Sequence, residues 1–213
     1  MFANLNNPTS TALSRADLRE LADIAEECDG NVLVDETFRE LAFDDTPPSA
    51  AEFGPRMIAL STVTKLCGLG TLRVGWIVGA ADSINRFARL KDYTTGGGSV
   101  LSQTIAAWAL GRWDFFVRRA KRILAVNRKI AREALREMSA LRGDVPSAGT
   151  VMFPHSTVNV ATLANRLLKQ YGTVIAEGRF FGVSDHFRLG LGGDTRDLRN
   201  GLANLRRLLR SLS

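Results

Sequence analysis

The chain is best understood from one stretch, Ser61-Thr62-Val63-Thr64-Lys65-Leu66-Cys67-Gly68-Leu69-Gly70-Thr71-Leu72-Arg73-Val74-Gly75-Trp76. In it, Lys65 follows small hydroxyl residues just after an apolar run, and Arg73 comes eight positions later. A lysine amine can form a Schiff base with an aldehyde, while hydroxyls and a guanidinium can hold a phosphate. The glycines let the backbone come close to a ligand. The stretch therefore predicts a site for an aldehyde cofactor that also carries a phosphate.

Around this stretch, strand-like and helix-like segments alternate along the chain. Such alternation predicts an α/β fold, with a mostly parallel sheet covered by helices and a smaller α+β portion after it. Ser14-Arg15-Ala16-Asp17 matches a capping box with Asp in place of Glu, so a helix is expected to begin there. The segment 44–55, which contains three prolines, is expected to be a loop. The expected strands are 31–35, 56–60, 73–79 and 187–191, and the further expected helices are 81–91, 101–110, 114–138, 160–171 and 197–212.

Composition excludes several classes of protein. With 45% hydrophobic and 23% charged residues, the 213-residue chain has an ordinary globular composition. No signal peptide is recognisable, and no apolar run approaches the ~20 residues of a membrane span, so we expect a cytoplasmic protein with no membrane partner. Cys28 and Cys67 are too few for a disulfide framework. Together with His155 and His186 they lack metal-ligand spacing, so we expect no metal site.

The formal net charge of +6 is concentrated between Arg112 and Arg142. Leu124, Ile130 and Met138 interleave with the basic residues at near-helical spacing, which predicts a long amphipathic helix with a solvated basic face. The alternative, a nucleic-acid groove, has no supporting motif, and we expect no nucleic-acid partner. The basic residues include Arg118, Arg119, Lys121, Arg122, Arg128, Lys129, Arg132 and Arg136.

Three segments resemble one family. The stretch 61–76 resembles the lysine segment of class I/II aminotransferases, the pyridoxal-phosphate-dependent enzymes of fold type I. Asn7-Pro8-Thr9-Ser10 resembles the family's Asn-Pro-Thr-Gly turn, with Ser10 where glycine is usual, and 171–192 resembles its closing segment. The resemblance implies a partial fold type I aminotransferase. Residues 1–122 would form a partial large, cofactor-binding domain, and 123–213 the α+β small domain.

The resemblance also implies roles for individual residues in binding pyridoxal 5′-phosphate. Lys65 would form the Schiff base and, once released by substrate, move the proton between substrate and cofactor carbons. Asp35 follows a short buried strand, where α/β sheets place ligand sites, and would keep the pyridinium nitrogen protonated. The alternative for Asp35 is an ordinary helix cap or strand-end aspartate. Arg73, Thr62 and Thr64 would bind the phosphate.

Further positions follow from the other two segments. Asn7 would hydrogen-bond the cofactor's ring oxygen, although an ordinary Asn-Pro turn is the alternative. Arg188 would bind the substrate α-carboxylate, which suits its planar pair of donors. His186 and Arg179 are expected to be surface residues. Phe38 stands where the family usually has a tyrosine whose hydroxyl donates to the ring oxygen, and its loss is expected to slow the chemistry.

The family's large N-terminal portion, which precedes the Asn-Pro-Thr turn, has no counterpart before Asn7. We therefore expect an uncovered sheet edge, an exposed apolar face and a cofactor site that lacks one wall. We expect that a homo-oligomer or a completing partner chain covers these exposed surfaces. The expected function is amino-group transfer between an amino acid and a 2-oxo acid by a shortened aminotransferase. The alternative is a catalytically degenerate module that binds a ligand or a partner.

Overall fold

The computed structural model describes residues 1–212 and divides into two compact units. The first unit contains residues 1–6 and 11–120, and the second contains residues 7–10 and 121–213. The short segment 7–10, which includes Asn7, thus belongs with the C-terminal part of the chain.

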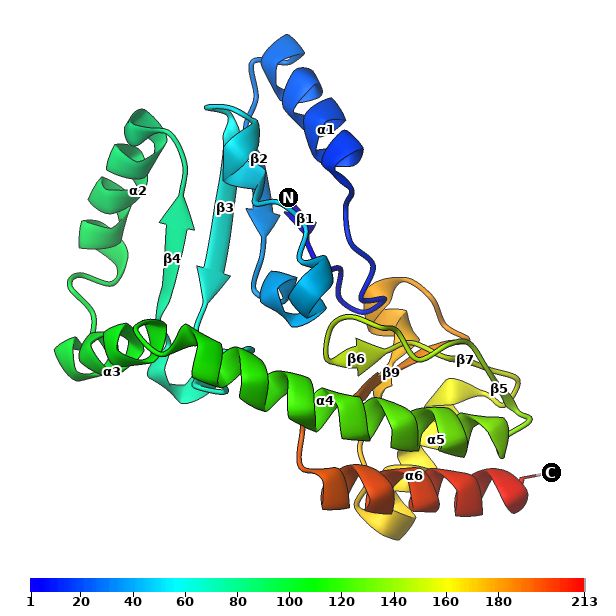
Figure 1. The fold of residues 1–213 in the computed structure, drawn as a ribbon. Helices are drawn as coiled ribbons and strands as arrows, with labels where there is room; N and C mark the ends of the chain where they lie inside the picture. Colours follow the sequence, from blue (N-terminus) through cyan, green and yellow to red (C-terminus); the bar gives the residue numbers. More distant parts are fainter. Residues whose placement is uncertain (213) are drawn as a thin grey trace. The chain divides into compact units, whose positions relative to one another are not determined.

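A four-stranded sheet forms the centre of the first unit (Figure 1). Its order is β1 (Phe2–Ala3), β2 (Val32–Asp35), β3 (Met57–Thr62) and β4 (Gly75–Val78). The strands β1, β2 and β3 are parallel to their neighbours, whereas β4 runs antiparallel to β3. The prediction of an α/β fold with a mostly parallel sheet is therefore confirmed, and the sheet is mixed because of its edge strand.

The helix α1 (Arg15–Glu27) begins at the predicted capping box. The Asp17 amide donates to Ser14 Oγ and the Ser14 amide donates to the Asp17 carboxylate, which satisfies two otherwise unpaired donors. Leu18 on this helix is fully buried and belongs to the same apolar cluster as Val34 of β2 and Met57 of β3. This packing holds α1 against the sheet.

The segment between β2 and β3 is more regular than predicted. The prediction of a loop over 44–55 was wrong, because the 3₁₀ helix η1 (Arg39–Asp45) ends within it and η2 (Ala50–Phe53) lies inside it. Ser49 and Glu52 form a capping box that starts η2, and Ala50 is fully buried. Proline-rich composition marks chain breaks, but it does not exclude single helical turns of this kind.

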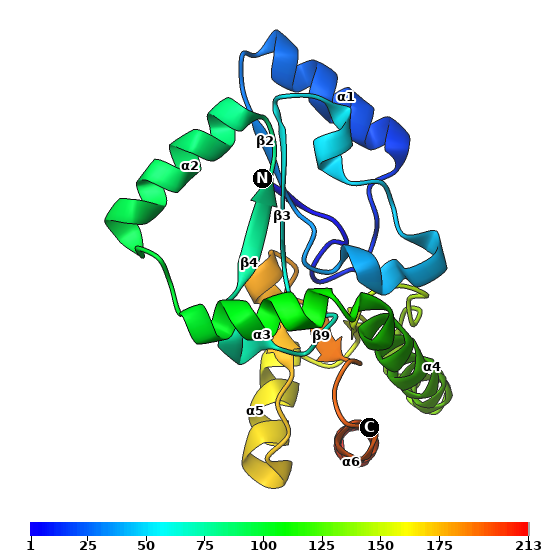
Figure 2. The same cartoon turned by 60° about the vertical axis from the view of Figure 1, so that its left-hand side comes forward.

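Two helices follow β4 in the first unit, α2 (Ala81–Thr94) and α3 (Val100–Leu110). Both views show α2 beside β4 (Figures 1 and 2). No residue of α2 is buried, and Tyr93 is 91% exposed. Large apolar side chains are also exposed on β4 and α3, namely Ile77, Val78, Val100, Leu101, Trp108 and Leu110. The first unit therefore presents an exposed apolar surface over α2, α3 and β4.

Most residues of the second unit lie after position 120. The helix α4 (Trp113–Arg136) starts in the first unit and continues into the second, which also contains α5 (Val160–Tyr171) and α6 (Thr195–Arg210). The helices α5 and α6 contact each other. An antiparallel sheet has the order β6 (Val151–Met152), β9 (Phe187–Gly190) and β8 (Ala176–Glu177), and β5 (Leu141–Arg142) pairs with β7 (His155–Ser156).

The helix α4 is amphipathic as predicted. Leu124 and Ile130 within it are buried, and so is Met138 two residues beyond its end. One member of its expected solvated basic face departs from the prediction. Arg128 is only 8% exposed, and its Nη2 donates to the Gly149 carbonyl at 2.8 Å. Burial and the neighbouring Arg132 lower the pKa of this guanidinium from its ordinary value. Arg128 therefore lies inside the second unit and is not part of a solvated face.

None of the helices in residues 1–212 combines the length and apolar character needed to cross a membrane. In the same described part of the chain, no group of three or more His, Cys, Asp or Glu side chains is arranged to hold a metal ion.

Candidate active site

The predicted cofactor residues of the first unit follow the ends of neighbouring strands. Asp35 is the last residue of β2, and Thr62 is the last residue of the adjacent parallel strand β3. Parallel neighbours end at the same edge of a sheet, which is where open α/β sheets bind ligands. Thr64, Lys65 and Arg73 all lie in the loop 63–74 that connects β3 to β4. The fold therefore brings Asp35 and the lysine loop to one edge of the sheet.

The carboxylate of Asp35 is held by the backbone that follows it. Its Oδ1 accepts a hydrogen bond from the Thr37 amide at 2.9 Å. This bond fixes the side chain at the strand end and leaves Oδ2 as a second acceptor. Asp35 can therefore be an ordinary strand-end aspartate and still bind a cofactor. A carboxylate has acceptor sites on both of its oxygens.

The loop 63–74 is folded tightly by its own residues. Thr62 Oγ1 accepts from the Thr64 amide at 3.1 Å, and Arg73 Nη1 donates to the Gly70 carbonyl at 3.2 Å. Arg73 has φ +55°, a left-handed conformation that is uncommon for a residue with a side chain and concentrates at functional sites. A Cβ at Gly75 would lie 2.7 Å from the Ser61 carbonyl, so only glycine fits there.

Lys65 is exposed at the surface of the first unit. Its Nζ lies 5.1 Å from the centroid of the Phe38 ring, a cation–π contact. Phe38 precedes η1, so the turn after β2 provides the aromatic neighbour of the lysine in the loop after β3. The amine is thus oriented by a ring and remains accessible to a ligand.

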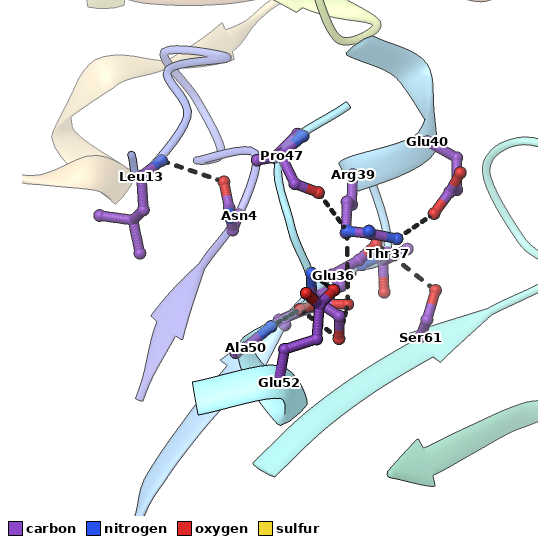
Figure 3. A network of polar contacts seen from close by, with 12 residues as sticks. Asn4, Leu13, Glu36, Thr37, Arg39, Glu40, Pro47, Ala50, Glu52 and Ser61 are labelled. Atoms are coloured by element: carbon purple, nitrogen blue, oxygen red, sulfur yellow. Dashed lines mark hydrogen bonds and ion pairs between the residues drawn. The ribbon is translucent and has the colours of Figure 1, made fainter. Parts of the chain in front are cut away.

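One buried group beside this edge was not predicted. Glu36, next to Asp35, is 5% exposed and accepts hydrogen bonds from the Ala50 amide at 2.6 Å and from Ser49 Oγ (Figure 3). Arg39 Nε lies 3.8 Å from its carboxylate. Burial raises the pKa of Glu36 above its ordinary value, and the hydrogen bonds oppose this effect. Glu36 therefore ties β2 to η2 behind the predicted site.

Further hydrogen bonds near this edge use backbone groups of the residue after β2, of the segment after η1 and of the N-terminal segment. Arg39 Nε donates to the Pro47 carbonyl at 2.8 Å, and Ser61 Oγ donates to the Glu36 carbonyl at 3.4 Å (Figure 3). Asn4 Oδ1 accepts from the Leu13 amide at 3.1 Å. These bonds fix the turns on either side of the strand ends.

The second unit contains the other two predicted residues, and it brings them into contact. Arg188 Nη1 donates to Asn7 Oδ1 at 2.8 Å, although 181 positions separate them in the sequence. Ser10 has φ +61°, which explains why glycine is usual at this position, and its Oγ donates to the Val151 carbonyl at 2.9 Å. The segment 7–10 is thereby attached to β6.

Two residues expected at the surface of the second unit differ from each other. Arg179 is exposed and pairs with Glu177. His186 is only partly exposed, because its ring stacks on Phe153 at 5.1 Å and its Nδ1 lies 2.6 Å from Asp185 Oδ1. His186 thus lies at the surface as expected, but it also packs against aromatic residues of its unit. The hydrogen bond with His186 lowers the pKa of Asp185.

Comparison with protein families decides how this geometry is to be understood. The family model described as aminotransferase class I and II matches residues 1–205. The chain belongs to the class I and II aminotransferase family. Solved structures of this family are pyridoxal-phosphate-dependent and of fold type I, so the resemblance and the partial fold expected from the sequence are confirmed.

Individual relatives agree with this assignment. Capreomycidine synthase from Streptomyces vinaceus is 30% identical over 93% of the chain and 52% of its own length. Aspartate aminotransferase from Thermococcus kodakarensis is 28% identical over 94% of the chain and 54% of its own length. A PLP-dependent aminotransferase from Streptococcus suis superimposes on the whole chain, with a TM-score of 0.93 and 26% identity, over 57% of its own length. The chain thus spans about half the length of the curated relatives it matches.

The residues of this aminotransferase-family chain fit pyridoxal phosphate by their chemistry. Lys65 offers an accessible amine for the aldehyde, Arg73 a guanidinium for the phosphate, and Asp35 a carboxylate for the ring nitrogen. Phe38 has no hydroxyl to offer the ring oxygen. The donor set therefore suits the cofactor at each of these groups except that oxygen.

Proposed function

We propose that this chain binds pyridoxal 5′-phosphate and transfers an amino group between an amino acid and a 2-oxo acid. The observation that carries the proposal is the placement of Asp35 and the Lys65 loop after neighbouring parallel strands. Bound pyridoxal phosphate supplies an electron sink for the charge left when the substrate's α-proton is removed. The residues of the chain supply attachment, orientation and proton transfer.

Each predicted residue has a defined task in this proposal. The Lys65 amine would hold the cofactor and, once free, would act as the base for the substrate α-proton. Asp35 would keep the ring nitrogen protonated, and Arg73, Thr62 and Thr64 would hold the phosphate. In the second unit, Asn7 would offer its amide NH₂ to the ring oxygen, since its Oδ1 already accepts from Arg188. Arg188 would bind the substrate carboxylate.

We also propose that residues 1–122 act as the cofactor-binding domain and 123–213 as the small domain. The two compact units change over between Ala120 and Lys121, which supports a boundary in this region. The exposed apolar surface over α2, α3 and β4 supports function as a homo-oligomer or with a completing chain. The free cysteines Cys28 and Cys67 fit a reducing, cytoplasmic setting.

Two alternatives have specific support. The 30% identity to a protein named capreomycidine synthase favours a synthase reaction on an amino acid as the second candidate. Phe38 favours a degenerate module that binds the cofactor or an amino acid without turnover.

The test uses the full chain with pyridoxal phosphate, pyruvate and a panel of amino acids, and it measures alanine and 2-oxo acid formation. Lys65→Arg is the test variant, and Lys91→Arg on α2 is the matched control. Amino transfer requires alanine formation by the wild type and by Lys91→Arg, with a loss of at least about 10²-fold in Lys65→Arg. Consumption of an amino acid without 2-oxo acid would favour the synthase, and binding without consumption would favour the module.

A further inference from the structure

Arg188 is held by two groups of the second unit in addition to its own strand. Asn7 Oδ1 accepts from its Nη1, and the Phe181 ring centroid lies 5.2 Å from its Cζ. This separation is within the range of a cation–π contact. A ring that covers the face of a guanidinium leaves the N–H donors at its edge available. Because Asn7 accepts from one of them, the others remain for a ligand.

The ring of Phe181 is itself supported by neighbouring aromatic residues. Phe181 meets Phe153 edge-on, at 5.7 Å between centroids and 83° between planes. Phe153 in turn stacks on His186, at 5.1 Å and 24°. We call Phe153 and His186 the aromatic shelf. The shelf limits the freedom of Phe181 although the side chain is only partly buried.

The backbone also attaches the turn that carries Phe181 to the strand that carries Arg188. The 3₁₀ helix η4 (Gly178–Phe181) begins where the Gly178 amide donates to the His186 carbonyl at 2.7 Å. The Val183 amide closes the turn by donating to the Gly178 carbonyl at 3.0 Å. A Cβ at Gly178 would collide with the carbonyl oxygens of Val183 and His186. The position of Phe181 relative to β9 is therefore defined by hydrogen bonds.

Arg179, which also lies over an aromatic ring, differs from Arg188 in the neutralisation of its charge. Arg179 lies over the Phe180 ring at 4.8 Å, but it also pairs with the Glu177 carboxylate at 2.9 Å. In residues 1–212, no carboxylate forms an ion pair with Arg188, and its hydrogen-bond partner Asn7 is neutral. Arg179 is thus neutralised by its own chain, whereas the charge of Arg188 is left for an external anion.

We propose that Phe181 is a positioning residue for carboxylate recognition: its ring, backed by the shelf, orients the Arg188 guanidinium toward a 2-oxo or amino acid carboxylate. The inference rests on the proposed function for the role of Arg188 and adds the residue that fixes its orientation. The ligand class is a small monocarboxylate, because one guanidinium edge binds one carboxylate in a bidentate manner.

The test observes Arg188 directly in the full chain labelled with ¹⁵N-arginine, without cofactor. Arg188→Lys identifies the Arg188 Nε–Hε resonance, which the ring current of Phe181 should displace from those of exposed arginines. Phe181→Leu should abolish this displacement, whereas Phe181→Tyr and the matched control Phe180→Leu should retain it. Titration with pyruvate should then give a half-saturation concentration about five-fold higher in Phe181→Leu, as expected for the loss of one cation–π contact.

Three results would overturn the inference: an Arg188 resonance unchanged by Phe181→Leu, an equal response to Phe180→Leu, or pyruvate binding that is absent or independent of Phe181. The readouts do not require pyridoxal phosphate. Phe181-dependent pyruvate binding by a chain that never forms a Lys65 adduct would therefore refute the proposed function and leave this inference standing.

Discussion

The Nζ atom of Lys65 lies 5.1 Å from the centroid of the Phe38 ring. The negative face of an aromatic ring attracts an ammonium group, so this contact holds the amine in place without a hydrogen bond. A tyrosine at the same position would keep the ring and add a hydroxyl. Phe38 thus preserves the orientation of Lys65 and removes a donor that pyridoxal phosphate could use.

Phe38→Tyr tests the consequence of this missing hydroxyl. With pyridoxal phosphate bound, the pH midpoint of its colour change is expected to fall by about one unit or more, because a donated hydrogen bond favours the charged form of the ring oxygen. Absorption spectra across a pH series measure the midpoint. Phe53→Tyr adds a hydroxyl elsewhere in the first unit and should leave the midpoint unchanged. Equal midpoints in all three proteins would refute a role for position 38.

Glu36→Gln tests the buried carboxyl behind the site. Because burial raises its pKa in the folded state, the folded chain binds the proton more tightly than the unfolded chain. The tighter proton binding adds to the free energy of unfolding. This addition is complete at pH values below the ordinary pKa of 4.5, and it decreases as the pH rises through the raised pKa of the folded state. Urea unfolding in a pH series that starts near the ordinary value should show a decrease in wild type that is smaller in the variant. Identical pH profiles would contradict the assignment.

Ser10 tests the left-handed turn of the second unit. Ser10→Ala loses the bond to the Val151 carbonyl and is expected to lower the free energy of unfolding by about 1 kcal/mol. Ser10→Gly loses the same bond but relieves a conformation that costs a side chain roughly 1–2 kcal/mol, so it should be at least as stable as wild type. Urea denaturation compares the three proteins. A glycine variant less stable than the alanine variant would show that the strain is absent.

Gly178→Ala tests the turn that carries Phe181. The added Cβ would collide with two carbonyl oxygens, and we expect a loss of stability of about 2 kcal/mol or more. Gly190→Ala is the matched control, since a Cβ there meets nothing within 4 Å and its φ is not left-handed. Thermal unfolding followed by circular dichroism distinguishes them. Equal melting temperatures would mean that η4 adjusts freely.

Much of the fold follows from local patterns in the sequence. The Ser14 capping box, the period of α1 and the helix over 160–171 are local features, and the structure contains them as predicted. The antiparallel direction of β4 was not predicted, although loop 63–74 offers a signal. A parallel neighbour needs a crossover, usually a long helix, whereas this loop contains only the short 3₁₀ turn η3 (Gly70–Leu72).

The parts that could not be predicted depend on distant partners. Glu36 is buried where Ser49 and Ala50 fold back onto it, and Arg128 is buried where the Gly149 carbonyl accepts a hydrogen bond from its Nη2. Helical spacing alone does not distinguish Arg128 from its exposed neighbours. The contact between Asn7 and Arg188 joins opposite ends of the chain, and only the family resemblance suggested a shared purpose for them.

Covalent trapping of pyridoxal phosphate shows whether Lys65 is the residue that binds the cofactor aldehyde. The full chain is incubated with the cofactor, reduced with borohydride and digested, and the modified lysine is identified by mass spectrometry. We expect a phosphopyridoxyl group on Lys65 at stoichiometric cofactor, and its loss in Lys65→Arg but not in Lys91→Arg. Modification spread equally over Lys65, Lys91, Lys121, Lys129 and Lys169, or absent from Lys65, would contradict it.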